Sequence, residues 1–187
     1  MSTVIEHLRA GREESLAQLI EYLKIPCIST TGTHVREGGE HLAGLMERAG
    51  LETRIMETAG HPAVYGEAKG PAGAPTLLVY GHYDVQPAEM GEGWTTHPFE
   101  PDIRDGRIFA RGSGDNKGQH FAQVKAVEAY RATNTALPIN LKFLVEGEEE
   151  MGSTNLGAFI AENKDLLRAD IACSSDGSLH PSGRPTI

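Results

Sequence analysis

The sequence has 187 residues, enough for one domain that buries about 70% of the surface of its unfolded chain. It carries 26 acidic against 17 basic residues and a net charge of −9, which argues against nucleic acids and anionic membranes as partners, because both attract clustered Lys and Arg. No uncharged run approaches the length of a membrane span, which indicates a soluble protein. Cys27 and Cys173 lie in apolar surroundings far apart in the sequence, which favours reduced thiols and a cytoplasmic location.

Apolar periodicity divides the chain into alternating helices and strands. The predicted helices cover residues 4–23, 42–49, 118–131 and 155–167, and the predicted strands cover residues 51–56, 63–67, 77–80, 107–110, 139–145 and 170–173. Residues 28–39 and 88–105 predict loops, and residues 185–187 predict the start of another strand. Strands that alternate with helices imply an α/β fold, and we expect a three-layer α/β/α sandwich with a mostly parallel central sheet.

The strand that begins at Leu77 leads into His82-Tyr83-Asp84. In extended chain, residues i and i+2 point to the same side, so His82 and Asp84 can leave the strand end together. An imidazole that binds a metal through one nitrogen needs an acceptor for the hydrogen on the other, and Asp84 is well placed to supply it. A turn at Gly81, with both side chains bonded to loop backbone, is the alternative, and the motif alone leaves both interpretations open.

Three other predicted strands lead to carboxylates, namely Asp115, the run Glu148-Glu149-Glu150, and Asp176. Neighbouring carboxylates repel one another unless they are solvated or share a cation. An acidic first turn of the next helix would also explain the glutamates, but Ser153, the expected helix cap, follows them. An ordinary turn residue is the alternative for Asp176.

These groups are expected to converge, because the carboxyl ends of parallel strands lie along one edge of a sheet. One histidine with several carboxylates is a ligand set for zinc or a similar divalent ion, and two such ions that share a carboxylate can promote hydrolysis. A further carboxylate must stay off the metals to accept a proton from the attacking water. The pattern therefore favours a metal-dependent hydrolase.

At these residues the sequence resembles the M20 family of metallopeptidases. The matching stretches are Gly81 to Pro87, Gly112 to Gly118, Glu146 to Ser153, and Ser175-Asp176, in the family's order and with similar spacing. The resemblance implies hydrolysis of a dipeptide or an N-acyl amino acid by a two-zinc site, with Mn²⁺ or Co²⁺ as possible substitutes. Residues 85–87 and 94–101 are most similar to the dipeptidase branch, with an N-acyl amino acid deacylase as the alternative.

The resemblance also implies a role for each residue of the site. His82 and Asp176 would hold the first metal, Asp115 would bridge both metals, Glu150 would hold the second, Glu149 would be the general base, and Asp84 would orient His82. The peptide bond between Asp115 and Asn116 is expected to be cis. Glu148 is left as a variable, solvated residue. The other histidines are not expected to be ligands; they are His7, His34, His41, His61, His97, His120 and His180.

Members of this family are longer than 187 residues. They carry a second domain that serves as lid and dimer surface, followed by a segment that supplies another histidine to the second metal. Residues 1–187 are therefore expected to be the amino-terminal part of a truncated catalytic domain with little activity, and the complete enzyme is expected to be a homodimer. Two other classes stay open: a metal-binding α/β domain without catalysis, and a structural α/β domain whose acidic loops are only solvated.

Overall fold

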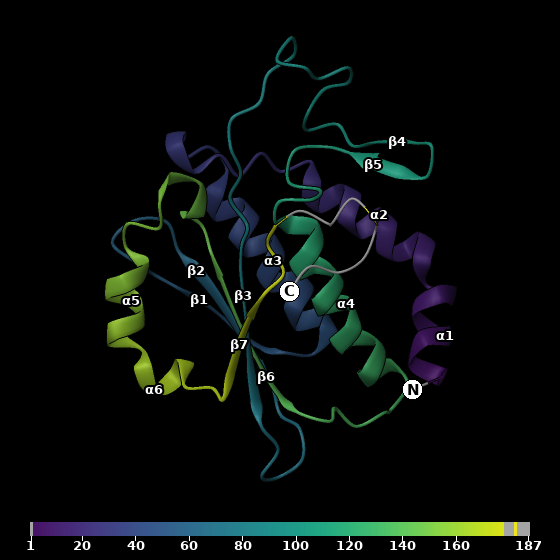
Figure 1. Ribbon diagram of the computed structural model, residues 1–187, viewed down its shortest axis with the longest axis vertical. Helices are drawn as coiled ribbons and strands as arrows, with labels where there is room; N and C mark the ends of the chain where they lie inside the picture. The colour runs from purple at the N-terminus through teal and green to yellow at the C-terminus, as the bar shows by residue number, and fades with distance from the viewer. Residues whose placement is uncertain (1, 178–181, 183–187) are drawn as a thin grey trace.

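A five-stranded sheet runs through the centre of the protein, whose computed structural model describes residues 2–177 and Ser182 (Figure 1). Its strands are β1 (Glu52–Met56), β2 (Ala63–Ala68), β3 (Thr76–His82), β6 (Asn140–Glu146) and β7 (Ile171–Ser174). They lie in the order β1-β2-β6-β3-β7. Because β2 alone runs against its neighbours, four of the five strands point in one direction, which confirms the predicted mostly parallel sheet.

Helices cover both faces of this sheet (Figure 1). On one face lie α3 (Val35–Ala49) and α4 (Lys117–Ala132), with α1 (Ser2–Ala10) and α2 (Arg12–Leu23) packed against them. On the other face lie the shorter helices α5 (Leu156–Glu162) and α6 (Lys164–Leu167). Two short 3-10 helices, η1 (Ser29–Thr31) and η2 (Glu149–Met151), lie in the connections. The three layers confirm the predicted α/β/α sandwich.

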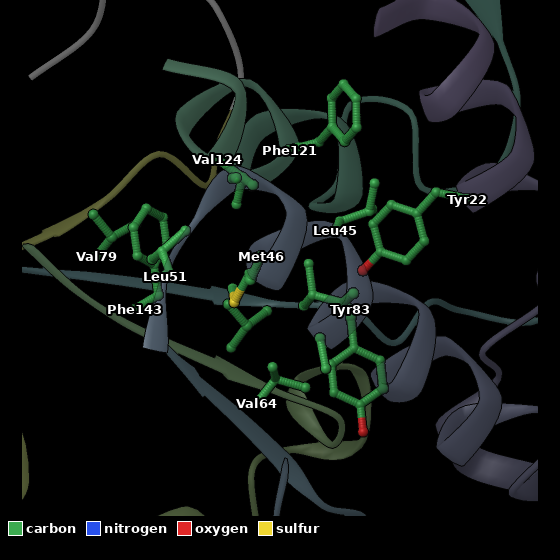
Figure 2. Packing of buried hydrophobic residues seen from close by; sticks show 14 of the residues in the cluster. Tyr22, Leu45, Met46, Leu51, Val64, Val79, Tyr83, Phe121, Val124 and Phe143 are labelled. Carbon is green, nitrogen blue, oxygen red and sulfur yellow. The ribbon is translucent and has the colours of Figure 1, made fainter. Parts of the chain in front are cut away.

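Two hydrophobic clusters join the layers. The larger one brings Met46 of α3 and Phe121 of α4 against Val79 of β3 (Figure 2). The smaller one packs Phe159 of α5 against Tyr65 of β2 on the opposite face. Each large apolar side chain that is fully buried contributes roughly 1.5 to 3 kcal/mol, so the two clusters fix the sheet and the ends of its strands in place.

The predicted helix 4–23 and the predicted loop 28–39 are both wrong at glycine residues. The predicted helix 4–23 is two helices, because the chain breaks at Gly11, a residue that costs a helix about 1 kcal/mol relative to alanine. The predicted loop 28–39 is wrong at its end, since α3 already begins at Val35 and includes Gly38. A Cβ at Gly38 would overlap the Sγ of the buried Cys27, so glycine serves close packing there instead of a turn.

The predicted helix 155–167 is also wrong, because the structure divides it into α5 and α6. The break falls at Asn163, whose side-chain amide donates to the carbonyl oxygen of Phe159 at 2.8 Å and so competes with the helical backbone. Ser153, the expected cap, instead donates its hydroxyl to Glu146 at 2.8 Å, and Asn155 precedes the first helical residue.

A hairpin stands apart from the central sheet (Figure 1). It consists of β4 (Asp102–Arg104) and β5 (Arg107–Phe109), which pair with each other and with no other strand in the described residues. Two corrections follow: β4 occupies the end of the predicted loop 88–105, and the predicted strand 107–110 does not join the sheet. Asp105 and Gly106 both have positive φ, 52° and 71°, which makes a tight two-residue turn and pairs the strand with its neighbour in sequence.

The remaining expectations concern the cysteines, the membrane and the carboxyl terminus. Both cysteines are unpaired, but Cys173 lies exposed on β7 and not in apolar surroundings, because β7 is the last strand of the sheet that the described residues form. No helix in the described part of the chain is both long and apolar enough to cross a membrane. Residues 185–187, predicted to begin another strand, lie outside the described residues.

Candidate metal centre

His82 occupies the centre of the site, at the carboxyl end of β3, between β6 and β7. Its side chain is fully buried. The Nδ1 atom donates to the backbone carbonyl oxygen of Asp84 at 3.0 Å, and the Asp84 carboxylate oxygen Oδ1 lies 3.4 Å away. These two acceptors hold the ring so that Nε2 faces the other side of the site. A metal-binding imidazole is held in this way by acceptors on its second nitrogen.

Carboxylates surround the Nε2 atom of His82. The nearest oxygens belong to Asp115 at 3.0 Å, Asp176 at 3.4 Å and Glu149 at 3.8 Å. Two groups have ligand atoms that all lie within 4.8 Å of one another: His82 with Asp115 and Asp176, and His82 with Glu149 and Glu150. The structure thus brings together the residues that the sequence analysis predicted, from four segments of the chain.

This donor set fits a divalent cation. One neutral nitrogen and several carboxylate oxygens match the ligands that zinc and similar ions take in proteins. Burial by itself lowers the pKa of His82, but the hydrogen bond and charge of Asp84, with the charge of Glu149, outweigh it and raise the pKa to about 9. The carboxylates therefore favour a positive charge at Nε2, which a proton or a metal ion can supply.

Asp84 links the histidine to the glutamates. It is fully buried, and its Oδ1 and Oδ2 atoms accept the backbone N–H groups of Glu149 at 3.2 Å and Glu150 at 3.0 Å. One carboxylate thus contacts the His82 ring and fixes the turn η2 that carries both glutamates. Asp84 was predicted to orient His82, but its carboxylate also holds the backbone of Glu149 and Glu150.

Asp115 reaches the site by a different route from the one expected. The strand before it belongs to the separate hairpin, so Asp115 does not follow a strand of the central sheet. It lies instead in the turn that leads into α4, and its peptide bond to Asn116 is cis, as predicted. The convergence at one edge was correct for His82, Glu149 and Asp176, whose strands are β3, β6 and β7.

The surroundings of Glu149 raise the pKa of its carboxylate. Burial raises its pKa, the charge of His82 opposes the rise, and the carboxylates of Glu150 and Asp176 add to it. A carboxylate accepts protons more effectively when its pKa is closer to neutrality. Because Glu149 also belongs to one of the two possible ligand groups, distance alone does not separate a base from a metal ligand at this position.

The prediction that Glu148 is solvated was wrong. Its side chain is buried and accepts the backbone N–H of His61 at 3.0 Å and the Nδ2 amide of Asn155 at 3.0 Å. It ties the loop before β2 to the loop before α5. A carboxylate inside an acidic run gives no sign in the sequence that distant loops will enclose it, since its partners are a backbone amide and an asparagine.

Sequence reasoning also missed Gln86. Its Nε2 atom donates to the backbone carbonyl and the carboxylate Oε2 of Glu150, both at 2.9 Å. The signal was its position two residues after Asp84, because side chains at i and i+2 of an extended chain point to the same side. Gln86 therefore holds the carbonyl and carboxylate of Glu150, while Asp84 holds its backbone N–H.

The other described histidines lie outside these two ligand groups. Among the described residues, His82 is the only histidine in either possible ligand group. His61 contacts the carbonyl oxygen of Ser29, and the buried His120 contacts Tyr22 and Asn116. Burial and the nearby charges of His82 and Lys117 lower the pKa of His120 to about 3, so it is neutral. His180 lies outside the described residues.

The chain is similar in sequence and in structure to known peptidases. The chain is 32% identical over 176 residues to the cysteinylglycine-S-conjugate dipeptidase of Corynebacterium striatum, an alignment that covers 93% of the chain and 38% of that protein. Human carnosine dipeptidase 1 has a TM-score of 0.87 and 29% identity, over 94% of this chain and 41% of the other. An M20 family metallo-carboxypeptidase from Sulfolobus solfataricus has a TM-score of 0.85 and 42% identity, over 92% and 39%.

The matched regions cover between 20% and 43% of the lengths of six curated dipeptidases that are similar to this chain. The family model for peptidase family M20/M25/M40 matches residues 78–185, which include His82, Asp84, Asp115, Glu149, Glu150 and Asp176. The fold, the order of the site residues and this match agree with one another. The chain belongs to peptidase family M20/M25/M40.

Proposed function

We propose that the protein is a metal-dependent dipeptidase that hydrolyses the peptide bond of a small peptide. The observation that carries the proposal is the set of carboxylates around the buried Nε2 atom of His82. The similarity of the chain to curated dipeptidases supports small peptides as substrates.

His82, Asp115 and Asp176 would hold one divalent ion, and Asp115 with Glu150 would hold a second. Zinc is the proposed ion, with Mn²⁺ or Co²⁺ as substitutes, because nitrogen and carboxylate ligands suit all three. When bound, such ions polarise the scissile carbonyl group and lower the pKa of the attacking water.

Glu149 would accept a proton from the attacking water and pass it to the leaving amine. Its raised pKa supports this role, because a carboxylate takes up a proton more readily when burial and neighbouring carboxylates raise its pKa. Asp84 would orient both residues, because its carboxylate lies beside the His82 ring and its Oδ1 atom accepts the backbone N–H of Glu149 at 3.2 Å. Orientation of this kind keeps the base and the ligands in register during the reaction.

We further propose that residues 1–187 form the amino-terminal part of a longer catalytic domain. Three dipeptidase relatives support the proposal. Their alignments include 93% to 100% of this chain but only 38% to 43% of the length of each relative. The complete enzyme would be a cytoplasmic homodimer. Residues 1–187 alone would have dipeptidase activity near background, since Asp115 and Glu150 offer the second ion only carboxylates.

The test is amino acid release by the complete enzyme, purified without chelator. It is expected to cleave Cys-Gly or β-Ala-His faster than an N-acetyl amino acid, to lose activity with a chelator, and to regain it when Zn²⁺, Mn²⁺ or Co²⁺ is restored. Faster cleavage of the N-acetyl amino acid would identify a deacylase instead. Tight metal binding without cleavage of either substrate would identify a metal-binding domain and contradict the proposed hydrolase.

A further inference from the structure

The three residues proposed to hold the first ion come from three separate segments of the chain. His82 ends β3, Asp115 lies in the turn before α4, and Asp176 follows β7. His82 is fixed by burial, but the side chains of Asp115 and Asp176 are 62% and 31% exposed, and all four residues of β7 are exposed. Packing therefore does not explain how the two carboxylates are held near the Nε2 atom of His82.

A chain of side-chain amides connects the three segments. The backbone N–H of His82 donates to Oδ1 of Asn116 at 3.1 Å, Nδ2 of Asn116 donates to Oε1 of Gln119 at 2.5 Å, and Nε2 of Gln119 donates to the carbonyl oxygen of Gly177 at 3.3 Å. Asn116 is the residue after Asp115, and Gly177 is the residue after Asp176. Each proposed ligand is therefore itself bonded to this amide chain or is the sequence neighbour of a residue that is.

The direction of these hydrogen bonds is fixed at both ends. A backbone N–H can only donate and a backbone carbonyl can only accept, so the amides of Asn116 and Gln119 have one orientation that satisfies all three bonds. His120 supports this orientation, because its Nδ1 atom also contacts Oδ1 of Asn116, at 3.2 Å, while its Nε2 atom contacts the Tyr22 hydroxyl at 3.1 Å.

The surrounding chain leaves room for the amides. A Cβ at Gly81 would lie 2.5 Å from Oδ1 of Asn116, so only glycine allows the amide to approach the end of β3. One helical turn after Gln119, Nε2 of Gln123 donates to the hydroxyl of Ser175 at 3.1 Å. The same face of α4 thus contacts the loop on both sides of Asp176, and Figure 1 shows this loop passing beside α4.

We infer that Gln119 is a positioning residue of the proposed metal site, which sets the distance between Asp176 and the pair His82 and Asp115 by bridging Asn116 to Gly177. The inference rests on the proposed function, since it assumes that these residues bind an ion. The hydrogen bonds of Gln119 go to Asn116 and Gly177 and not to the three ligands themselves. Its effect would be on the geometry that the ligands have before the ion arrives, and groups that orient metal ligands typically change affinity by roughly 10- to 100-fold.

The test is Co²⁺ binding by the chain, followed by titration and by visible absorption. Gln119→Met keeps the length and helix preference of the side chain but removes both hydrogen bonds, and Gln119→Ala removes them with no steric demand. Both variants are expected to bind Co²⁺ roughly 10- to 100-fold more weakly than the wild type and to shift the visible band, because ligand geometry changes. Gln18→Met is the matched control, because this half-buried glutamine of α2 also loses hydrogen bonds, to Glu14 and Lys125, but makes none to the proposed ligands, and it is expected to leave both readouts unchanged.

The outcomes separate this inference from the proposed function. Wild-type affinity and an unshifted band in both Gln119 variants would overturn the positioning role and leave the metal site intact. Failure of both variants to fold, by circular dichroism, would show that Gln119 serves the fold and would also overturn it. Absence of Co²⁺ binding by the folded wild type would contradict the proposed metal site itself.

Discussion

Replacing Glu149 by glutamine in the complete enzyme is expected to lower dipeptide turnover by roughly 10² to 10⁴-fold, because an amide of the same shape cannot take a proton from the attacking water. Metal affinity should stay close to that of the wild type, since Glu149 is proposed to stay off the ions. Steady-state kinetics with a dipeptide and metal titration of the same preparation measure both quantities.

Glu150→Gln is the matched variant, because the two glutamates are neighbours in η2 and are fixed by the same Asp84 carboxylate. It is expected to weaken metal binding, since it removes a proposed ligand. Loss of metal by Glu149→Gln, with unchanged binding by Glu150→Gln, would show that the two roles are reversed. That outcome would agree with the ligand group in which Glu149 lies within reach of His82.

Asp84→Asn is expected to destabilise the protein by roughly 1 to 3 kcal/mol, because an amide has only one acceptor oxygen. The carboxylate accepts two backbone N–H groups on different oxygens, from Glu149 and Glu150. In either orientation of the amide, its NH₂ group faces one of these donors, which is left unpaired in a fully buried site. Because the His82 ring loses its charged neighbour as well, metal affinity should fall by roughly 10- to 100-fold.

Urea unfolding of the metal-free protein measures the first effect, and metal titration measures the second. Asp165→Asn is the control: this residue is exposed in α6, where surface substitutions usually change stability by less than about 0.5 kcal/mol. An unfolding free energy of Asp84→Asn equal to that of the wild type would show that the Asp84 carboxylate does not hold the glutamate turn.

The strand ends were the part of the site that the sequence could predict. His82, Glu149 and Asp176 follow apolar runs that form β3, β6 and β7, and parallel strands place such residues along one edge. Asp115 was predicted for a partly wrong reason, because its preceding strand pairs locally in the hairpin. A short run of alternating residues does not tell whether its partner is a neighbour in sequence or a distant strand.

What the sequence could not predict depends on tertiary contacts. Glu148 is enclosed by the segments of His61 and Asn155, and its surroundings exist only once those loops meet. Gly38 was taken as part of a loop because glycine usually favours turns, yet it lies inside α3 against Cys27. Gln119 looked like an ordinary helix residue, because its partners lie in the turn before α4 and after β7.

We propose that His82 forms the centre of a divalent metal site. The most direct test is metal analysis of residues 1–187 by plasma mass spectrometry, after chelation and reloading with Zn²⁺, together with titration calorimetry. We predict one tightly bound ion per chain, because His82 is the only histidine in the possible ligand groups of the described residues and the second ion would have only carboxylates. His82→Gln should weaken binding on the order of 10² to 10³-fold, given that zinc sites of about four ligands bind with ~10 to 16 kcal/mol, and His7→Gln, an exposed control, should not. No bound ion in the folded wild type, or equal binding by His82→Gln, would contradict the claim.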